Sequence, residues 1–288
     1  MQALDLVHRW PVDHVSVAAI VAPRSGDATG ADTTRVVATI GESNRSYRLA
    51  SVAKTITTWA VLVAVEEGLL ALDSPLGQPG CTLRHLLSHA GGYPFDGDEP
   101  TTAPGRRRIY SNTGIELAAA AVAAGADMPF ADYIREAVTE PLGMSATELR
   151  GSPAHGIWST SADMVRFLLE TITPSLISAA TAAEACQPVF ADLPGIVPGV
   201  GRYDRCSWGL GFELKGDKNP HWTGTRNSPE TFGHFGGAGT FVWVDLGAAH
   251  DRAVACVALT NRPFDEWAPE ALQLWPALSD AVLAEALG

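Results

Sequence analysis

The pattern of apolar and polar residues predicts strands at both ends of the chain and helices in its middle. Two short β-branched runs, "VSVAAIVAP" (15–23) and "TRVVATIGE" (34–42), are separated by the polar stretch "RSGDATGADT" (24–33), which is typical of a hairpin with a long connection. Strand-like runs return after about residue 205, as "SWGLGFELK" (207–215), "ETFGHFG" (230–236), "GTFVWVDLG" (239–247) and "RAVACVALTNR" (252–262). The two ends are therefore expected to share one sheet.

Between these regions the apolar residues follow a helical period. The stretch "SVAKTITTWAVLVAVEEGLL" (51–70) predicts one long apolar helix that is capped by Ser51 and ends near Gly68. Further helices are predicted at 82–90, 112–126, 129–143 and 159–174, and a last one at 267–287.

The simplest assembly of these elements is an α/β fold of the α+β type. It has one mostly antiparallel sheet from both chain ends, flanked by helices, and an inserted helical lobe. We assign residues 1–55 and 200–288 to the sheet domain and residues 56–199 to the mainly helical lobe. A ligand site is expected between the two.

Composition narrows the class of protein. With 288 residues, 46% of them hydrophobic and 18% charged, the chain is typical of a globular protein with a large core. A net charge of −12 argues against a nucleic-acid partner, and the only basic run, "GRRR" (105–108), is short and expected to lie in an exposed loop. The apolar run 15–22 predicts a strand and not the core of a signal peptide, and no stretch is long enough to span a membrane. We therefore expect a cytoplasmic protein.

The cysteines give no sign of a metal site. Cys81, Cys186, Cys206 and Cys256 are far apart and form no C-x-x-C pair, which favours four reduced core thiols. No H-E-x-x-H motif is present. We expect neither a metal nor an organic cofactor.

Lysine is rare in this chain, which has only Lys54, Lys215 and Lys218. The last two lie in "ELKGDKNP" (213–220), which is predicted to be an exposed turn. Lys54 instead enters the apolar helix, three residues after Ser51, on the same helix face. Burial lowers a lysine pKa, so Lys54 could accept the Ser51 proton. The alternative is a capping serine and a lysine that reaches the surface.

Two other segments carry candidate chemistry. In "YSN" (110–112), Tyr110 could share proton transfer with Lys54, because a nearby cation favours the phenolate, and Asn112 could position a substrate or Lys54. The alternative is a surface tyrosine and a capping asparagine. In "GHFGGAGTF" (233–241), His234 could line the site and the Gly237 N–H could bind an oxyanion. The alternative is a bulge with a core histidine. The similar "HAG" (89–91) lies at a predicted helix end and is read as a decoy.

In this order, S-x-x-K, Y-x-N and H-x-G resemble the penicillin-recognising serine hydrolases, specifically the branch of class C β-lactamase-related esterases and D-aminopeptidases. The segments "LLSHAGG" (86–92), "EPLGMSAT" (140–147), "GIWSTSADMVRFL" (156–168) and "SWGLGF" (207–212) are also similar to phrases of that branch, so the resemblance covers about residues 15–265. It implies Ser51 as acylated nucleophile, Lys54 as its activator and Tyr110 as acid/base partner. It also implies substrate binding by Asn112, His234 and Gly236, with the Ser51 and Gly237 amides as oxyanion hole.

The third motif departs from the K-T-G of penicillin-binding enzymes. His234 and Phe235 replace a lysine and a hydroxyl that help to recognise the substrate carboxylate, so an apolar group should be better accommodated. We expect an esterase or amidase that acts on small esters. The alternatives are a β-lactamase or a D-alanyl or D-amino-acid peptidase, acyl transfer to a small alcohol, and a catalytically silent binding protein.

Overall fold

In the computed structural model, which describes residues 1–23, 36–249 and 252–288, six strands form one antiparallel sheet. Their order is β2-β1-β11-β10-β9-β8, and the neighbouring strands β1 and β11 come from opposite ends of the chain. The strands are β1 (Val15–Pro23), β2 (Val36–Ile40), β8 (Glu213–Leu214), β9 (Phe232–Gly236), β10 (Thr240–Asp245) and β11 (Arg252–Thr260). This confirms the predicted antiparallel sheet. The stretch expected to connect β1 and β2 lies outside the described residues.

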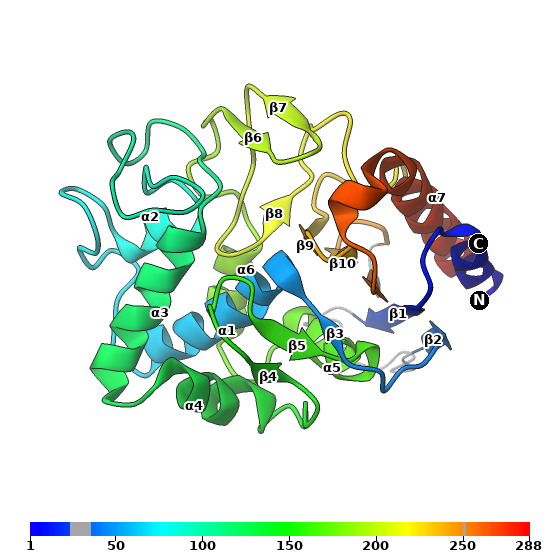
Figure 1. Cartoon of the computed structure of the whole chain (residues 1–288), viewed down its shortest axis with the longest axis horizontal. Helices are drawn as coiled ribbons and strands as arrows, with labels where there is room; N and C mark the ends of the chain where they lie inside the picture. Colours follow the sequence, from blue (N-terminus) through cyan, green and yellow to red (C-terminus); the bar gives the residue numbers. More distant parts are fainter. Residues whose placement is uncertain (24–35, 250–251) are drawn as a thin grey trace.

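Helices cover both faces of the sheet, which explains why its strands are apolar without alternation. Along β1, Ala18 and Ile20 join the core that includes helices α1 and α5, whereas Val17 and Ala19 join the core under α7 (Ala268–Leu287). The 3₁₀ helix η1 (Gln2–Arg9) lies beside α7, so the two chain ends are neighbours in Figure 1.

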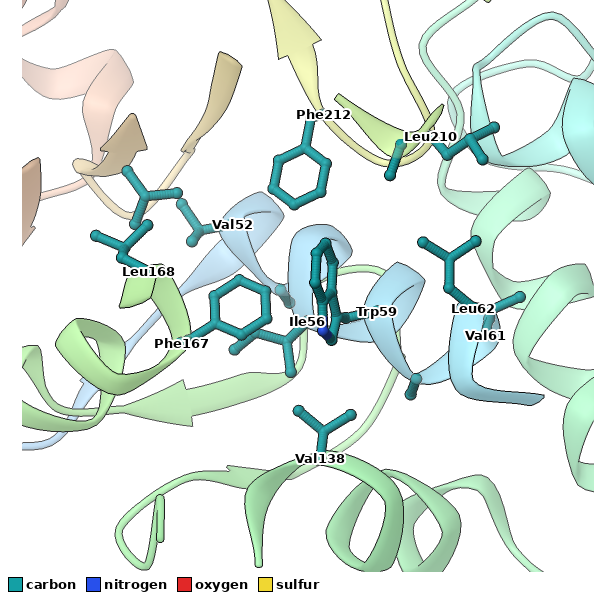
Figure 2. Packing of buried hydrophobic residues seen from close by; sticks show 14 of the residues in the cluster. Val52, Ile56, Trp59, Val61, Leu62, Val138, Phe167, Leu168, Leu210 and Phe212 are labelled. Carbon is teal, nitrogen blue, oxygen red and sulfur yellow. The ribbon is translucent and has the colours of Figure 1, made fainter. Parts of the chain in front are cut away.

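Helix α1 (Ala53–Glu66) runs through the middle of the molecule and is buried on every side over most of its length. Its Trp59 packs against Phe167 and Phe212, which meet it edge-on at ring distances of 6.0 and 6.2 Å (Figure 2). The indole N–H donates to the Glu170 carboxylate at 3.2 Å, so the buried polar atom is satisfied. The other helices are α2 (Leu83–Leu87), α3 (Asn112–Ala126), α4 (Phe130–Ile134), α5 (Ser161–Ile172) and α6 (Ala179–Ala185).

Three helix predictions need correction. Ser51 is not the cap of the long helix but lies in a separate 3₁₀ turn, η2 (Ala50–Val52). The predicted end of that helix near Gly68 is confirmed, because α1 ends at Glu66 and Gly68 has φ 79°. The helix expected over 129–143 is α4 followed by a π-helical turn, η3 (Arg135–Thr139). Helix α6 was not predicted, because its alanine-rich sequence carries little amphipathic signal.

The strand expected over 207–215 is reduced to two residues. Gly211 adopts φ 74°, and a Cβ there would lie 2.1 Å from the Thr58 hydroxyl, so the chain turns closely over α1 before β8 begins. This apolar segment is buried as a turn, which its composition does not distinguish from a buried strand.

Two small sheets complete the frame around the site. One has the order β3-β5-β4, from Tyr47–Arg48, Ile157–Ser159 and Glu148–Leu149, and the other pairs β6 (Gly195–Val197) with β7 (Gly201–Tyr203). The proposed division of the chain at residues 55 and 200 stays a prediction. Within the described ranges no single helix is long and apolar enough to cross a membrane, although the bent pair Asn112–Ala126 and Phe130–Thr139 passes by length and composition.

Candidate active site

Ser51 is presented by a strained turn between β3 and α1. The preceding residue, Ala50, has φ 47°, a left-handed conformation that costs free energy for a residue with a Cβ. Two contacts hold the turn: the Leu49 N–H donates to Ile157 O at 2.9 Å, and the Thr240 hydroxyl donates to Leu49 O at 2.8 Å. The serine is thus fixed against both the small sheet and the main sheet.

The glycine of the H-x-G motif is required by this close approach. A Cβ on Gly236 would lie 2.3 Å from the carbonyl oxygen of Leu49 and 3.2 Å from the Ala50 Cβ. Only a glycine lets the end of β9 lie directly against the turn that carries Ser51. Gly236 therefore acts through packing, and it brings the next residue, Gly237, to the edge of the same cavity as Ser51.

Lys54 is fully buried and contacts only uncharged groups. Its Nζ donates to Asn112 Oδ1 at 2.7 Å and to the Ala154 carbonyl at 3.0 Å, and lies 3.3 Å from Ser51 Oγ. Burial lowers the pKa of Lys54 to about 7, and the more distant carboxylates of Glu116 and Asp96 offset only part of that effect. The alternative of a lysine that reaches the surface is therefore wrong.

The three contacts of Lys54 accommodate both of its charge states. Asn112 Oδ1 and the Ala154 carbonyl are acceptors and take two N–H groups in either state. At Ser51 Oγ the ammonium donates its third N–H, whereas the neutral amine presents its lone pair to the serine hydroxyl. The Ala154 carbonyl, a backbone group about a hundred residues away in sequence, had no signal in the sequence.

Asn112 links Lys54 to the opening of helix α3. Its Nδ2 donates to Asp96 Oδ1 at 2.9 Å, so its side chain is already held in place on both atoms. The helix cap is not Asn112 but Ser111, whose hydroxyl accepts from the Gly114 N–H at 3.1 Å. This geometry supports the expected contact with Lys54.

Tyr110 and His234 line the same cavity as Ser51. The Tyr110 hydroxyl is 3.3 Å from His234 Nε2, while His234 Nδ1 is 2.6 Å from the Phe235 carbonyl. Burial lowers the pKa of His234 to about 3, so the ring is neutral. Because the carbonyl can only accept, Nδ1 carries the proton, and Nε2 accepts from the Tyr110 hydroxyl.

The expectation that the lysine favours a Tyr110 phenolate is wrong. Burial raises the pKa of Tyr110 well above its usual value, and a hydrogen bond with Ser51 opposes this only in part. The Lys54 Nζ is 4.7 Å from the centre of the tyrosine ring. At neutral pH the residue is therefore a phenol, able to donate a proton.

The histidine of the decoy "HAG" turns out to belong to this site. His89 follows α2, is buried, and packs its ring on Tyr110 at 4.7 Å and against Trp208 at 4.6 Å. Its Nδ1 accepts from the Ser111 N–H at 3.2 Å. The segment "HAG" is not the third motif, but the His89 ring packs against the Tyr110 ring and helps to position it.

A cavity of about 410 Å³ opens in front of Ser51. Its walls are mostly apolar and aromatic, and its polar side chains include two carboxylates, Glu213 and Asp265, but no lysine or arginine. The lining residues are Ser51, Phe95, Tyr110, Val197, Pro198, Gly199, Trp208, Glu213, His234, Phe235, Gly237, Phe264, Asp265 and Ala268. Residues from both the sheet ends and the helical middle of the chain therefore form it.

The turn that was expected to be exposed around Lys215 and Lys218 is exposed at Asp217, Asn219 and Pro220, but its two lysine side chains turn inward. Lys218 is 4% exposed, and its Nζ lies 3.3 Å from Glu213 Oε1 and donates to Ser207 O at 2.8 Å. Glu213 also accepts from the Trp222 indole N–H at 2.7 Å. Lys215 is half-buried and donates to Gly224 O at 3.0 Å. All three lysines of the chain are thus structural or functional, not solvated.

The arginines of "GRRR" divide between surface and interior. Arg106 and Arg107 are exposed as expected, but Arg108 is 2% exposed and does not reach the Ser51 cavity. It donates to the backbone carbonyls of Ser88, Val189, Phe190 and Cys206 and so ties four segments together. Burial lowers its pKa to about 10, which leaves it charged at neutral pH.

The four cysteines are free thiols, three of them buried and Cys186 half-buried. Within the described parts of the chain, no three His, Cys, Asp or Glu side chains lie close enough to hold a metal ion.

Comparison with known proteins agrees with this geometry. The sequence model of the Beta-lactamase family matches residues 42–278. A Beta-lactamase of Yersinia enterocolitica is 27% identical over an alignment of 189 residues, with 47% of this chain and 49% of that protein covered. Penicillin-binding protein 4* of Bacillus subtilis is 26% identical over an alignment of 141 residues, with 38% of this chain and 31% of that protein covered. The chain spans about half, or less, of these curated relatives.

Solved structures match over a longer range. A beta-lactamase from Mycobacterium bovis is 44% identical, with a TM-score of 0.89 and 99% of each chain covered. Simvastatin synthase from Aspergillus terreus is 17% identical, with a TM-score of 0.73 and coverage of 99% and 97%, a likeness of fold alone. Together with the match over residues 42–278, these findings show that the chain belongs to the Beta-lactamase family of serine hydrolases.

Proposed function

We propose that this protein hydrolyses small esters through an acyl-enzyme on Ser51. The observation that carries the proposal is the environment of Lys54: an amine with no exposed surface and, among the described residues, no carboxylate in contact, 3.3 Å from the Ser51 hydroxyl. A cation buried in that way is expensive, so the site favours the neutral amine, which is the form that can act as a base.

In the acylation step, Lys54 takes the Ser51 proton while Oγ forms a bond to the ester carbonyl carbon. The charge that develops on the carbonyl oxygen is stabilised by the backbone N–H groups of Ser51 and Gly237, which border the same cavity. These donors need no reorganisation, because the η2 turn and the end of β9 are already packed together.

The leaving alkoxide needs a proton when the carbonyl re-forms. Tyr110 is the proposed donor, because burial keeps it a phenol and its hydroxyl faces the cavity between Ser51 and His234. The proton that Lys54 accepted then returns to Tyr110. In the second half of the reaction a water molecule takes the place of the alcohol, and the same groups act in reverse to release the acid and regenerate Ser51.

The lining of the Ser51 cavity favours esters with an apolar group over penicillins. Penicillins carry a carboxylate, and no lysine or arginine among the described residues lines the Ser51 cavity to bind it. The charge of Glu213 is compensated by Lys218, but the exposed carboxylate of Asp265 repels anions. Phe235 supplies a ring in place of a hydroxyl, and Trp208 and Phe95 extend the apolar surface. An ester with a neutral, apolar group beside Tyr110 fits this lining best.

One observation favours a second candidate function. The carboxylate of Asp265 lies at the cavity and is exposed without an ion-pair partner among the described residues. It would suit the ammonium group of a D-amino-acid amide or peptide, so D-aminopeptidase activity is the alternative that we retain.

Labelling and turnover test the proposal together. Wild type and Ser51→Ala are treated with a fluorophosphonate and with a penicillin, and adducts are measured by intact mass. Turnover is compared on short-chain p-nitrophenyl esters, D-alanine p-nitroanilide and nitrocefin. We expect a fluorophosphonate adduct only when Ser51 is present, and fastest turnover of the esters. Efficient nitrocefin turnover would make the protein a β-lactamase, and absence of any adduct would support a silent binding protein.

A further inference from the structure

A second cavity lies beside the Ser51 cavity, and the two share Gly237. It has a volume of about 390 Å³ and is formed where the small sheet β3-β5-β4 meets the end of β11. Its lining residues are Arg45, Ser46, Tyr47, Arg48, Trp158, Gly237, Ala238, Thr260, Asn261 and Pro263. Because Gly237 is the proposed oxyanion donor, the second cavity borders the position proposed for the substrate carbonyl.

The charge of this second cavity is opposite to that of the first. Two arginines line it and no carboxylate does, whereas the Ser51 cavity is lined by two carboxylates and no arginine. In a chain of net charge −12, a cavity lined by arginine departs from the average surface.

Arg48 is the arginine available to a ligand. Arg45 is neutralised by Glu42, at 3.0 Å. Arg48 is exposed, and among the described residues its side chain contacts only a ring nitrogen, His155 Nδ1, at 3.3 Å. Its guanidinium therefore keeps a full charge and free N–H donors, in the planar arrangement that matches carboxylates and phosphates.

Trp158 supplies a flat surface beside that charge. Arg48 and Trp158 are paired in register on β3 and β5, which lie side by side in Figure 1, so their side chains project from the same face of the small sheet. A third arginine, Arg150, does not line the cavity. It packs its guanidinium on the Trp158 ring at 4.9 Å and pairs with Glu148. Trp158 is thereby held in one orientation next to the unpaired Arg48.

We infer that this cavity is a subsite for an anionic group, a carboxylate or a phosphate, on the part of the substrate that extends from Ser51 past Gly237, with Arg48 as its recognition residue. The inference rests on the proposed acyl-enzyme chemistry at Ser51. The preferred substrate is then an ester with a neutral apolar group on one side of the carbonyl and an anion on the other. A penicillin carboxylate that points to the third motif would find no such partner.

Two esters that differ only in this anion test the subsite. The ratio of kcat/KM for mono-p-nitrophenyl glutarate to that for p-nitrophenyl butyrate is measured for wild type, Arg48→Ala and Arg48→Glu. We expect the ratio to fall by about threefold to tenfold in Arg48→Ala, the effect of one partly exposed charge-assisted contact, and further in Arg48→Glu.

Arg107→Ala is the matched control, because Arg107 is exposed and lines neither cavity, and it should leave the ratio as in wild type. An unchanged ratio in both Arg48 variants would overturn the subsite while leaving the ester hydrolase intact. Conversely, a protein that turns over neither ester contradicts the proposed function.

Binding without turnover gives an independent readout. Glutarate and inorganic phosphate are titrated separately into Ser51→Ala, and tryptophan fluorescence is recorded. The signal of the Ser51→Ala/Trp158→Phe variant is subtracted, which leaves the contribution of Trp158. Both titrations are then repeated with Arg48→Ala added to each variant. Saturable quenching that depends on Arg48 supports the subsite even if the esters are not substrates, and the tighter of the two ligands identifies the anion. Quenching that is equal with and without Arg48, or absent, overturns it.

Discussion

Two buried lysines in this protein have opposite surroundings. Lys54, with no exposed surface, contacts an amide oxygen, a backbone carbonyl and a serine hydroxyl. Lys218 is almost as buried but lies 3.3 Å from the carboxylate of Glu213. Each lysine lies next to a residue that lines the Ser51 cavity: Lys54 contacts Ser51, and Lys218 contacts Glu213.

The difference lies in the charge of the partner. Without a carboxylate in contact, burial lowers the pKa of Lys54 to about 7, and the amine becomes a base. At the other lysine the charges compensate: burial alone would raise the pKa of Glu213, but Lys218 and His221 bring it down to about 2. Burial of a lysine therefore indicates catalysis only where no anion accompanies it.

The largest expected effect is on activity at Lys54. Lys54→Met keeps the length and packing of the side chain but removes the base, and should lower kcat/KM for p-nitrophenyl esters by about 10²- to 10⁴-fold. The folded state should be retained, as checked by circular dichroism and thermal unfolding, because no buried anion loses a partner. Activity within a few-fold of wild type would refute the role of Lys54 as the base.

The reverse result is expected at Lys218. Lys218→Met leaves the buried carboxylate of Glu213 without its main counter-charge, and should lower the free energy of unfolding by about 3–5 kcal/mol in denaturant titrations. The double variant Glu213→Gln/Lys218→Met should regain part of this loss. If the double variant were as unstable as the single one, packing and not charge would explain the effect.

A carboxylate introduced beside Lys54 should make it resemble Lys218. In wild type, kcat/KM should rise with pH through about 7, as Lys54 loses its proton. Asn112→Asp places an anion where Oδ1 now lies 2.7 Å from Nζ, and should move this midpoint up by about one to three pH units.

Asp96→Asn is the matched control with the opposite sign. Asp96 raises the pKa of Lys54 from a greater distance, so its loss should lower the midpoint slightly. Equal midpoints in all three proteins would mean that another group controls the profile.

The most gradual effects are expected in the pH dependence of stability, because each is spread over several pH units. Lys54 has a lowered pKa in the folded state, so the unfolded chain binds more protons between about pH 7 and 10.5, and stability should rise with pH across that window. Glu213 has a lowered pKa as well, so its contribution is complete above about pH 4.5 and is lost as the pH falls towards 2. Lys54→Met should remove the first slope and Glu213→Gln the second. If either slope persists in its variant, other groups produce it.

The sequence by itself determined the elements and their general arrangement. The apolar runs of 15–23 and 252–262 specified strands, because an uninterrupted β-branched run buries both faces of a sheet that helices cover. The three spaced motifs also nominated Ser51, Lys54, Tyr110, Asn112 and His234, which the structure brings into one site. Their catalytic roles stay predictions for the experiments above.

Only the tertiary structure decided the charge state and the neighbours of those residues. The neutral acceptors of Lys54, the burial that keeps Tyr110 a phenol, and the packing of His89 come from segments far apart in sequence. The same holds for "ELKGDKNP", whose polar composition predicted an exposed turn, although the fold buries Lys218 against Glu213. A sequence records which groups can ionise, but the dielectric surroundings and the partners that set their pKa values exist only after the chain has folded.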